Sequence, residues 1–430
     1  MIRLANVLIV DDNTSRADAL VQRLGQGGYH AVVALNATEG WMHARLEHPD
    51  LVLIASEAVP FGRSLKADSV SGDIPVIVLA ETVTPDLCAL ALDAGLDDVI
   101  ALQCGDDELF ARMRPLVRLA TMHAELRHRA QIAETFGVAA RDRVSGPENA
   151  LPAILLIGDD AARAQAVLGD CCDISLTDNL YEAEGLLTQR NFDAALVAFD
   201  VEPDDLLGFC SQVRNNPRLF NLPMVVLSGA DTAEAYRRGA TRVLPRPVDP
   251  VVLRSVMLTL VRRQQLRWSI RGALNDSLQG AARDDATGAY SRVFLDAFLS
   301  NRLDAAKAQD RHLAVVFFAS PNVDGVRRQF GEDAALHLTQ QVGQWITGLL
   351  RAEDLTAAYG PAEFCVVLPD TPLAEAEVVM HRIAGVLAYT DFAVREVYQP
   401  VKVWVQVGCT DSREDDDMAS LLVRARKNLD

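Results

Sequence analysis

The stretch RAEDLTAAYGPAEF, residues 351–364, decides the fold of the last third of the chain. It follows a long amphipathic helical pattern over residues 333–350 and leads into the apolar run Phe364-Cys-Val-Val-Leu368. Gly360 and Pro361 separate two strand-like runs, which is the composition of a hairpin turn. Asp354 completes an Arg-x-x-Asp motif with Arg351 and stands five residues before the turn. The stretch therefore predicts a β-hairpin that closely follows a charged motif at a helix end.

The residues around this stretch mix helical and strand patterns. A strand pattern covers residues 313–318, a helix pattern covers 373–388 and a further strand pattern covers 401–407. This mixed order, with a hairpin at one edge, predicts an α+β domain over residues 284–430.

Two earlier segments share one pattern, which makes them an internal repeat. One opens with Val7-Leu-Ile-Val-Asp-Asp-Asn13 and the other with Ile154-Leu-Leu-Ile-Gly-Asp-Asp160, each an apolar run that ends in paired acids. Further continuous apolar runs follow at regular spacing, with helical stretches between them. Such runs are typical of parallel strands covered on both faces. Each repeat is therefore predicted to be a doubly wound α/β domain with its site at the carboxyl ends of the strands.

A long helical pattern follows each repeat, over residues 108–143 and 250–283. Helices of this kind can pack against a twin in a homodimer, or can extend a domain as a solvated linker. The predicted organisation is a first α/β domain with its linker over residues 1–143, a second over 150–283 and the α+β domain over 284–430. A chain of 430 residues has room for about three domains of ~150 residues.

Composition and charge limit the partners. The formal net charge is −18, which argues against nucleic acid or an anionic membrane as a general partner. No apolar run approaches the ~18 residues that span a bilayer, and the first residues enter a strand pattern at once. The seven cysteines are odd in number and show no C-x-x-C spacing, as expected of core residues in a reducing compartment. We expect a cytoplasmic protein with no membrane insertion.

The repeats resemble response-regulator receiver domains, and the third segment resembles a GGDEF domain, the fold that condenses two GTP into cyclic di-GMP. Together they resemble PleD-like receiver–receiver–GGDEF regulators over the whole chain. The resemblance implies two CheY-like receiver domains followed by a domain of the nucleotidyl-cyclase type.

Phosphorylation of a receiver needs an acidic pair, an acceptor Asp, a hydroxyl and a Lys at separate strand ends. In the first repeat Asp11 and Asp12 form the pair. The acceptor position falls on Ala55 or Ser56, and the hydroxyl and Lys positions fall on Ala80 and Leu102. We expect no phosphorylation there.

The second repeat leaves two interpretations open. Asp159 and Asp160 form the acidic pair, and the acceptor position falls on Ala198 or Phe199. Asp200 is the candidate phosphoacceptor if the strand end shifts. Ser228 suits the hydroxyl position and Arg246 replaces the Lys, keeping the charge but not its geometry. The alternative is a docking domain in which Asp200 is simply solvated.

The cyclase positions of the third domain carry unsuitable residues. In the family, carboxylates hold two Mg²⁺ that support cyclisation. By resemblance, alanine or proline occupies those carboxylate positions here. The positions that would read guanine carry an arginine and a leucine, and proline in the signature turn removes a backbone N–H. The degenerate active-site positions are Ala319, Pro321, Arg327, Leu336, Pro361 and Ala362. We therefore expect no bound metal, no catalytic residue and no enzyme.

The family's inhibitory product site is complete by contrast. Arg351 and Asp354 have the spacing of that site, and Arg382 falls where the family supplies a second arginine from the next helix. Arginine matches the O6/N7 edge of guanine, and a carboxylate can accept from its N1–H and N2–H₂ groups. The motif alone is weak, because Arg246 with Asp249 and Arg413 with Asp416 repeat it, and an exposed ion pair is its ordinary meaning.

The resemblance implies a catalytically inactive cyclic di-GMP receptor, dimeric, that acts as a scaffold or adaptor for cell-cycle regulated proteolysis. In that family the partners are the adaptor RcdA and, through it, CtrA for degradation by ClpXP, gathered at a cell pole. Two alternatives stay open: a ligand-independent structural scaffold, and a phosphorylation-responsive regulator that uses Asp200.

Overall fold

The computed structural model describes residues 4–144, 151–159, 161–199, 205–216, 218–228, 232–395 and 397–429. Asp160 and the candidate phosphoacceptor Asp200 lie outside these residues. The chain forms two compact units, one of Ala5–Ala120 with Ser145–Ser269, the other of Met1–Leu4, Thr121–Val144 and Ile270–Asp430. The predicted domain bounds stay a prediction, and each unit is considered by itself below.

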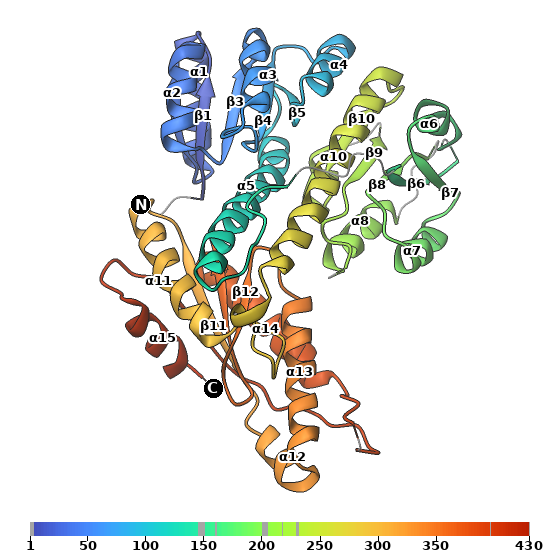
Figure 1. Ribbon diagram of the computed structural model, residues 1–430. Helices are drawn as coiled ribbons and strands as arrows, with labels where there is room; N and C mark the ends of the chain where they lie inside the picture. The colour runs from blue at the N-terminus through green and yellow to red at the C-terminus, as the bar shows by residue number, and fades with distance from the viewer. Residues whose placement is uncertain are drawn as a thin grey trace. The chain divides into compact units, whose positions relative to one another are not determined.

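The first repeat is a five-stranded parallel sheet with strand order β2-β1-β3-β4-β5 (Figure 1). Val7 and Ile9 face one hydrophobic core, and Leu8 and Val10 face the other, so the sheet is buried on both faces. The elements are β1 Asn6–Val10, α1 Thr14–Gln26, β2 His30–Ala34, α2 Ala37–Glu47, β3 Leu51–Ala55, the short η1 Ser56–Ala58, α3 Val59–Ala67, β4 Val76–Ala80, α4 Pro85–Asp93, β5 Asp98–Ala101 and α5 Asp106–Thr135.

The second repeat has the same architecture, with strand order β10-β9-β8-β6-β7, again all parallel. Ile154 and Leu155 face opposite cores, as the continuous apolar run requires. The elements are β6 Ala153–Ile157, α6 Ala161–Leu168, β7 Asp173–Thr177, α7 Leu180–Gln189, β8 Ala194–Val197, α8 Leu206–Asn215, β9 Met224–Ser228, α9 Thr232–Arg237, β10 Arg242–Pro245 and α10 Pro250–Asp276. The doubly wound α/β prediction is confirmed for both repeats.

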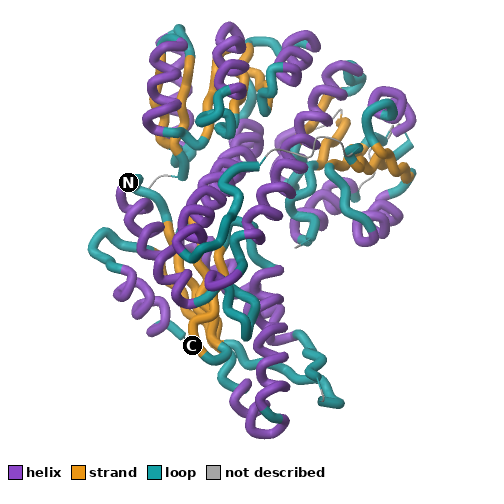
Figure 2. The backbone as a smooth tube through the Cα atoms, viewed as in Figure 1, coloured by secondary structure: helices purple, strands orange, loops and turns teal. Residues whose placement is uncertain are grey.

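The third domain contains an antiparallel sheet with strand order β12-β13-β11-β14. Figure 2 draws its strands in orange. Phe317 faces a core shared with α11 and α15, and Phe318 faces a core shared with α13 and α14. The elements are the short η2 Gly280–Ala282, α11 Arg292–Ala308, β11 Leu313–Ala319, α12 Val323–Phe330, α13 Glu332–Gly348, β12 Leu355–Gly360, β13 Glu363–Pro369, α14 Leu373–Tyr389, β14 Gln406–Asp411 and α15 Met418–Lys427. The predicted α+β class with its hairpin is confirmed.

Two sequence-based details differ from the structure. The strand predicted over residues 401–407 begins only at Gln406, and the linker helices end at Thr135 and Asp276, before the predicted ends. Ile132 and Ala133, near the end of α5, belong to a core of the third domain. In the part of the chain that the structure describes, every helix is too short or too polar to cross a membrane.

Candidate ligand-binding site

The hairpin of β12 and β13 positions the signature turn. Gly360 pairs with Glu363, so that Pro361 and Ala362 form the tip. Ala362 adopts a left-handed conformation with φ of 51°, which is uncommon for a residue with a Cβ. Its carbonyl accepts a hydrogen bond of 3.0 Å from the backbone N–H of Ser320. The turn is thereby fastened to the end of β11.

Two positions where the sequence predicted lost Mg²⁺ ligands lie close together. Ala319 ends β11 opposite Glu363, and Ala362 precedes Glu363 on the hairpin. Alanine offers no oxygen to a metal, and the assignment of these positions stays a prediction. Both carboxylate oxygens of Glu363 accept from the guanidinium of Arg426, at 2.8 and 2.9 Å. Among the described residues, no cluster of three or more His, Cys, Asp or Glu side chains could hold a metal ion.

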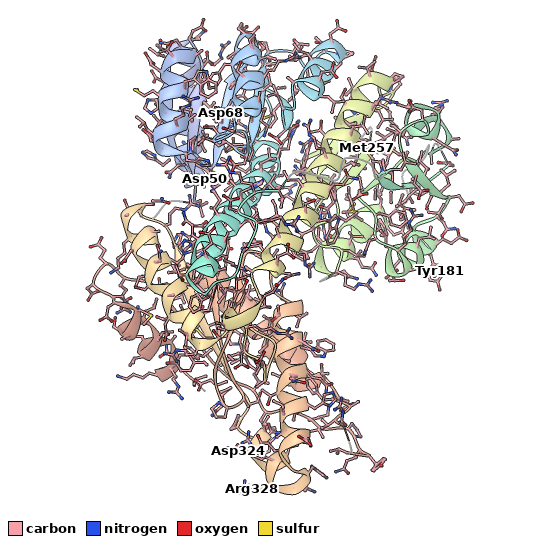
Figure 3. The ribbon with its side chains drawn as sticks, in the orientation of Figure 1. Asp50, Asp68, Tyr181, Met257, Asp324 and Arg328 are labelled. Carbon is pink, nitrogen blue, oxygen red and sulfur yellow. The ribbon has the colours of Figure 1, made fainter. Side chains whose placement is uncertain are left out.

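The positions to which the sequence analysis assigned guanine recognition lie on α12 and α13. Figure 3 labels Asp324 and Arg328 on α12, the short helix that also carries Arg327. The guanidinium of Arg327 pairs with the carboxylates of Asp324 and, at 2.8 Å, of Glu332. Leu336 lies on α13 and is partly exposed. The predicted loss of guanine recognition at Arg327 and Leu336 stays a prediction.

The Arg-x-x-Asp motif forms a turn directly after α13. A carboxylate oxygen of Asp354 accepts a hydrogen bond of 2.9 Å from the backbone N–H of Arg351, and Asp354 is only 8% exposed. The side chain of Arg351 is about one-third exposed, and its guanidinium lies 3.7 Å from a carboxylate oxygen of Glu375. The local fold therefore uses the Asp carboxylate to fix the turn, and holds the Arg351 side chain at a partly open surface.

Arg382 reaches the same place from α14. Its guanidinium donates a hydrogen bond of 3.0 Å to the carbonyl of Leu349, two residues before Arg351. Burial lowers the pKa of Arg382, the charge of Arg351 lowers it further, and Asp354 opposes both effects. The structure thus brings together the three residues that the sequence predicted as a ligand site.

A cavity of about 360 Å³ adjoins this cluster and is lined by Arg351 and Asp354, but not by Arg382. Three further arginines line it that the sequence interpretation missed: Arg129, Arg271 and Arg283. Arg129 comes from α5, and its guanidinium donates to the carbonyl of Glu353 within the motif. The only sequence signal for these residues was the richness of the linker helices in arginine.

The carboxylate of Asp11 in the first repeat is already held by a cation. Arg16 donates to both of its oxygens, at 2.6 and 2.7 Å. Ala55 ends β3 and Ala80 ends β4, where the acceptor and hydroxyl would stand, and Leu102 follows β5. These residues stand at the strand ends as expected from the sequence, and their roles stay a prediction.

The second repeat gives fewer placements. Ala198 directly follows β8 and is fully buried, Phe199 comes next, and Ser228 ends β9. Because Asp200 lies outside the described residues, its role as phosphoacceptor stays a prediction.

A family model, "Diguanylate cyclase, GGDEF domain", matches residues 281–430. The response regulator PleD of Caulobacter vibrioides is 25% identical over 439 residues, which cover 99% of this chain and 96% of PleD. The transcriptional regulatory protein KdpE of Mycobacterium tuberculosis is 33% identical over 138 residues, which cover 31% of this chain and 59% of KdpE. The architecture is therefore PleD-like, with receiver domains followed by a GGDEF domain.

Solved GGDEF domains also resemble part of the chain. That of DgcB from Caulobacter crescentus, in complex with c-di-GMP, is 16% identical with a TM-score of 0.34, and the match covers 35% of this chain and 85% of that one. That of PA1120 (TpbB or YfiN) from Pseudomonas aeruginosa is 27% identical with a TM-score of 0.32, and the match covers 34% of this chain and 84% of that one.

These comparisons correct one expectation. The prediction that the chain is not an enzyme is wrong, because the family model that matches its third domain describes a diguanylate cyclase. At the level of the whole chain, the comparisons give a response regulator with a GGDEF domain, the domain type of cyclic di-GMP signalling.

Proposed function

We propose that the third domain binds cyclic di-GMP at Arg351, Asp354 and Arg382, and that this binding controls the recruitment of protein partners. The observation that carries the proposal is the convergence of these three side chains beside a cavity lined by four arginines and one aspartate. A ligand with two phosphate groups and two guanine bases matches that chemistry, because guanidinium groups bind phosphates and the Hoogsteen edge of guanine.

The arginines of the linker helices extend the proposed site beyond the third domain's own elements. Arg129 belongs to α5 and Arg271 to α10, and both line the cavity with Arg351. A ligand that fills the cavity contacts the third domain and both helices at once. Ligand binding then favours one arrangement of these elements over another, provided that the two arrangements differ in affinity.

The proposed role is that of a scaffold or adaptor. The chain resembles PopA, a relative of PleD, and this resemblance supplies RcdA, CtrA and the ClpXP machinery as partners, a cell pole as the place and a homodimer as the assembly. Co-purification of RcdA with the full chain, with and without cyclic di-GMP, tests the adaptor role: ligand-dependent capture supports it, and equal capture contradicts the control by ligand.

Calorimetry tests the ligand site. Arg351→Ala should weaken cyclic di-GMP binding by about 10- to 100-fold, because it removes charge-assisted hydrogen bonds of ~1.5–3 kcal/mol. The matched control is Arg413→Ala, since the backbone N–H of Arg413 makes the same turn with Asp416 at 2.8 Å elsewhere in the domain. The control should bind like the parent.

Two results would contradict the proposal. Equal affinity of parent and Arg351→Ala would show that the ligand binds elsewhere, and an absence of heat with the parent would favour the ligand-independent scaffold. The cyclic di-GMP that the protein forms from GTP and Mg²⁺ is measured in a separate experiment. Product made by the protein is then not mistaken for added ligand.

A further inference from the structure

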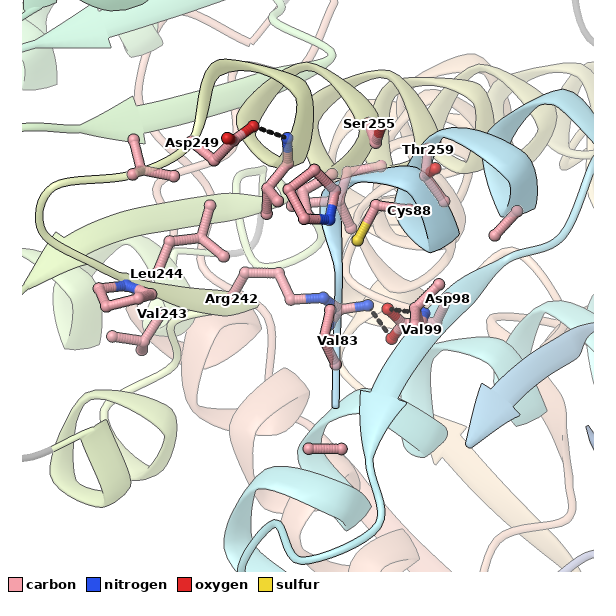
Figure 4. A pocket seen from close by; sticks show the side chains of 18 of the residues that line it. Val83, Cys88, Asp98, Val99, Arg242, Val243, Leu244, Asp249, Ser255 and Thr259 are labelled. Atoms are coloured by element: carbon pink, nitrogen blue, oxygen red, sulfur yellow. Dashed lines mark hydrogen bonds and ion pairs between the residues drawn. The ribbon is translucent and has the colours of Figure 1, made fainter. Parts of the chain in front are cut away.

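A second cavity lies within the unit formed by the two receiver repeats (Figure 4). Its volume is about 390 Å³. The first repeat contributes residues of α4, β5 and the start of α5, and the second contributes residues of β10 and α10. A molecule in this cavity would therefore contact both repeats.

Aliphatic side chains form most of the cavity wall. Val83 and Leu96 contribute from the first repeat, and Val252 and Val256 contribute from successive turns of α10. Cys88 of α4 also lines the cavity, and burial raises the pKa of its thiol, so the group stays neutral. The wall is thus a surface that water solvates poorly.

Three charged residues of the cavity lining are paired with one another. Asp98 accepts from Arg112 at 2.6 and 3.1 Å and from Arg242, a contact drawn in Figure 4. Burial would raise the pKa of Asp98, but the two guanidinium groups lower it overall, so the carboxylate is ionised and paired. The three side chains are between 2% and 7% exposed.

The remaining charged residues of the lining are also engaged. Glu108 accepts from Arg112 and, at 3.3 Å, from the hydroxyl of Tyr236. A carboxylate oxygen of Asp249 accepts from the backbone N–H groups of Val251 and Val252, at 2.8 and 3.3 Å, at the start of α10. An ionised ligand would lose its hydration on entering the cavity. The charged groups of the lining already have partners, so they would not compensate this cost.

We propose that this cavity binds a neutral, mainly apolar small molecule that bridges the two receiver repeats. The cavity lies in the ~300–1,000 Å³ range of small-molecule sites, and such sites are lined mainly by apolar side chains. Ser255 and Thr259 of α10 also line it and supply hydroxyls for one or two polar groups of the ligand. Such a ligand stabilises the packed pair of repeats and acts independently of any phosphoacceptor.

Fluorescence titration of the full chain with the neutral apolar dye N-phenyl-1-naphthylamine tests the proposal. The parent should show saturable binding at one site per chain. Val252→Trp fills the cavity and should weaken dye binding at least ~10-fold. The matched control is Val251→Trp, since Val251 is the preceding residue, is 43% exposed and does not line the cavity. The control should bind within about twofold of the parent.

A measurement on the unmutated protein keeps the proposal testable if Val252→Trp does not fold. With methyl-labelled valine, the dye should shift the signals of Val252 and Val256, assigned by conservative Val→Ile exchange. Absence of saturable binding, or shifts confined to valines outside the cavity, would overturn the proposal. Unchanged affinity in a folded Val252→Trp protein would do the same. Because cyclic di-GMP plays no part in these measurements, their result is independent of the function proposed above.

Discussion

Replacing Arg302 by methionine should loosen the last half of α5 from the third domain. Glu125 of α5 is 1% exposed, and the guanidinium of Arg302 on α11 lies 2.8 Å from one of its carboxylate oxygens. Arg302 also lies 3.4 Å from a carboxylate oxygen of Asp370, which accepts from Thr121 of the same helix at 3.1 Å. Burial raises the pKa of Glu125, and Arg302 is the strongest influence that opposes the shift.

The magnitude follows from the burial of both partners. Removing one member of a buried ion pair costs about 3–5 kcal/mol, because the other charge loses its main partner; the guanidinium of Arg129, 3.9 Å from Glu125, remains as a more distant one. Since ~1.4 kcal/mol is a factor of ten, amide hydrogens of residues 121–135 should exchange about 100- to 4,000-fold faster. Hydrogen exchange followed by mass spectrometry on the full chain measures this directly.

A control on the same helix isolates the cause. Arg292 of α11 also pairs with a carboxylate, that of Asp296 at 2.8 Å, but both side chains are 38% exposed. Arg292→Met should change protection of residues 121–135 little, since exposed pairs contribute ~0–1 kcal/mol. Adding Glu125→Gln to Arg302→Met should restore part of the protection. The reasoning is refuted if Arg302→Met and Arg292→Met give the same exchange in this segment.

Two further predictions concern stability. Burial, with the charge of Arg302, lowers the pKa of His128 to about 4; the unfolded chain therefore binds more protons between pH ~6.5 and 4, and stability present above pH 6.5 is lost as the pH falls. In calorimetric unfolding at several pH values, His128→Leu should remove about 2–3 kcal/mol of this loss. If the free energy of unfolding of His128→Leu depended on pH as in the parent, His128 would not be its cause. Gly158 has φ of 113°, and a Cβ there would lie 2.2 Å from the carbonyl oxygen of Ala198. Gly158→Ala should cost at least ~2 kcal/mol in thermal unfolding, whereas Gly185→Ala, in open space on α7, should stabilise by ~0.5–1 kcal/mol; equal effects would contradict the steric argument.

The sequence predicted the receiver sheets well because buried parallel strands need continuous apolar runs. It failed at residues 401–405, where alternation predicted a strand. There the backbone N–H of Trp404 donates to the side-chain oxygen of Asn322 at 2.9 Å, and the carbonyl of Lys402 accepts from the same side-chain amide at 2.8 Å. These backbone groups of Lys402 and Trp404 are thus satisfied by a distant side chain rather than by a strand ladder, and only Val401 forms an isolated bridge, with Phe392. Alternation cannot reveal such a partner 80 residues away.

The residues of the candidate site also differ in how well the sequence could predict them. The spacing of Arg351 and Asp354 is local, so sequence could predict it, and Arg382 follows once the helix after the hairpin is aligned. Arg129 and Arg271 line the cavity because the ends of the two linker helices pack on this domain, and Arg283 follows the second helix. In the sequence, the two helical arginines look like those of any solvated helix, because tertiary packing alone determines which face is covered.

The packing of α5 shows why the arginines of the linker helices matter for any ligand at the site. Leu109 and Met113 belong to a core of the first receiver, whereas Ile132 and Ala133 belong to a core of the third domain. Between them, within the third domain's unit, Arg129 holds the carbonyl of Glu353 and lines the cavity with Arg351. Four guanidinium groups around one cavity repel one another, and an anionic ligand relieves that repulsion. A ligand bound there therefore changes the energy of a helix that is also part of a receiver, which an exposed Arg-x-x-Asp ion pair could not do.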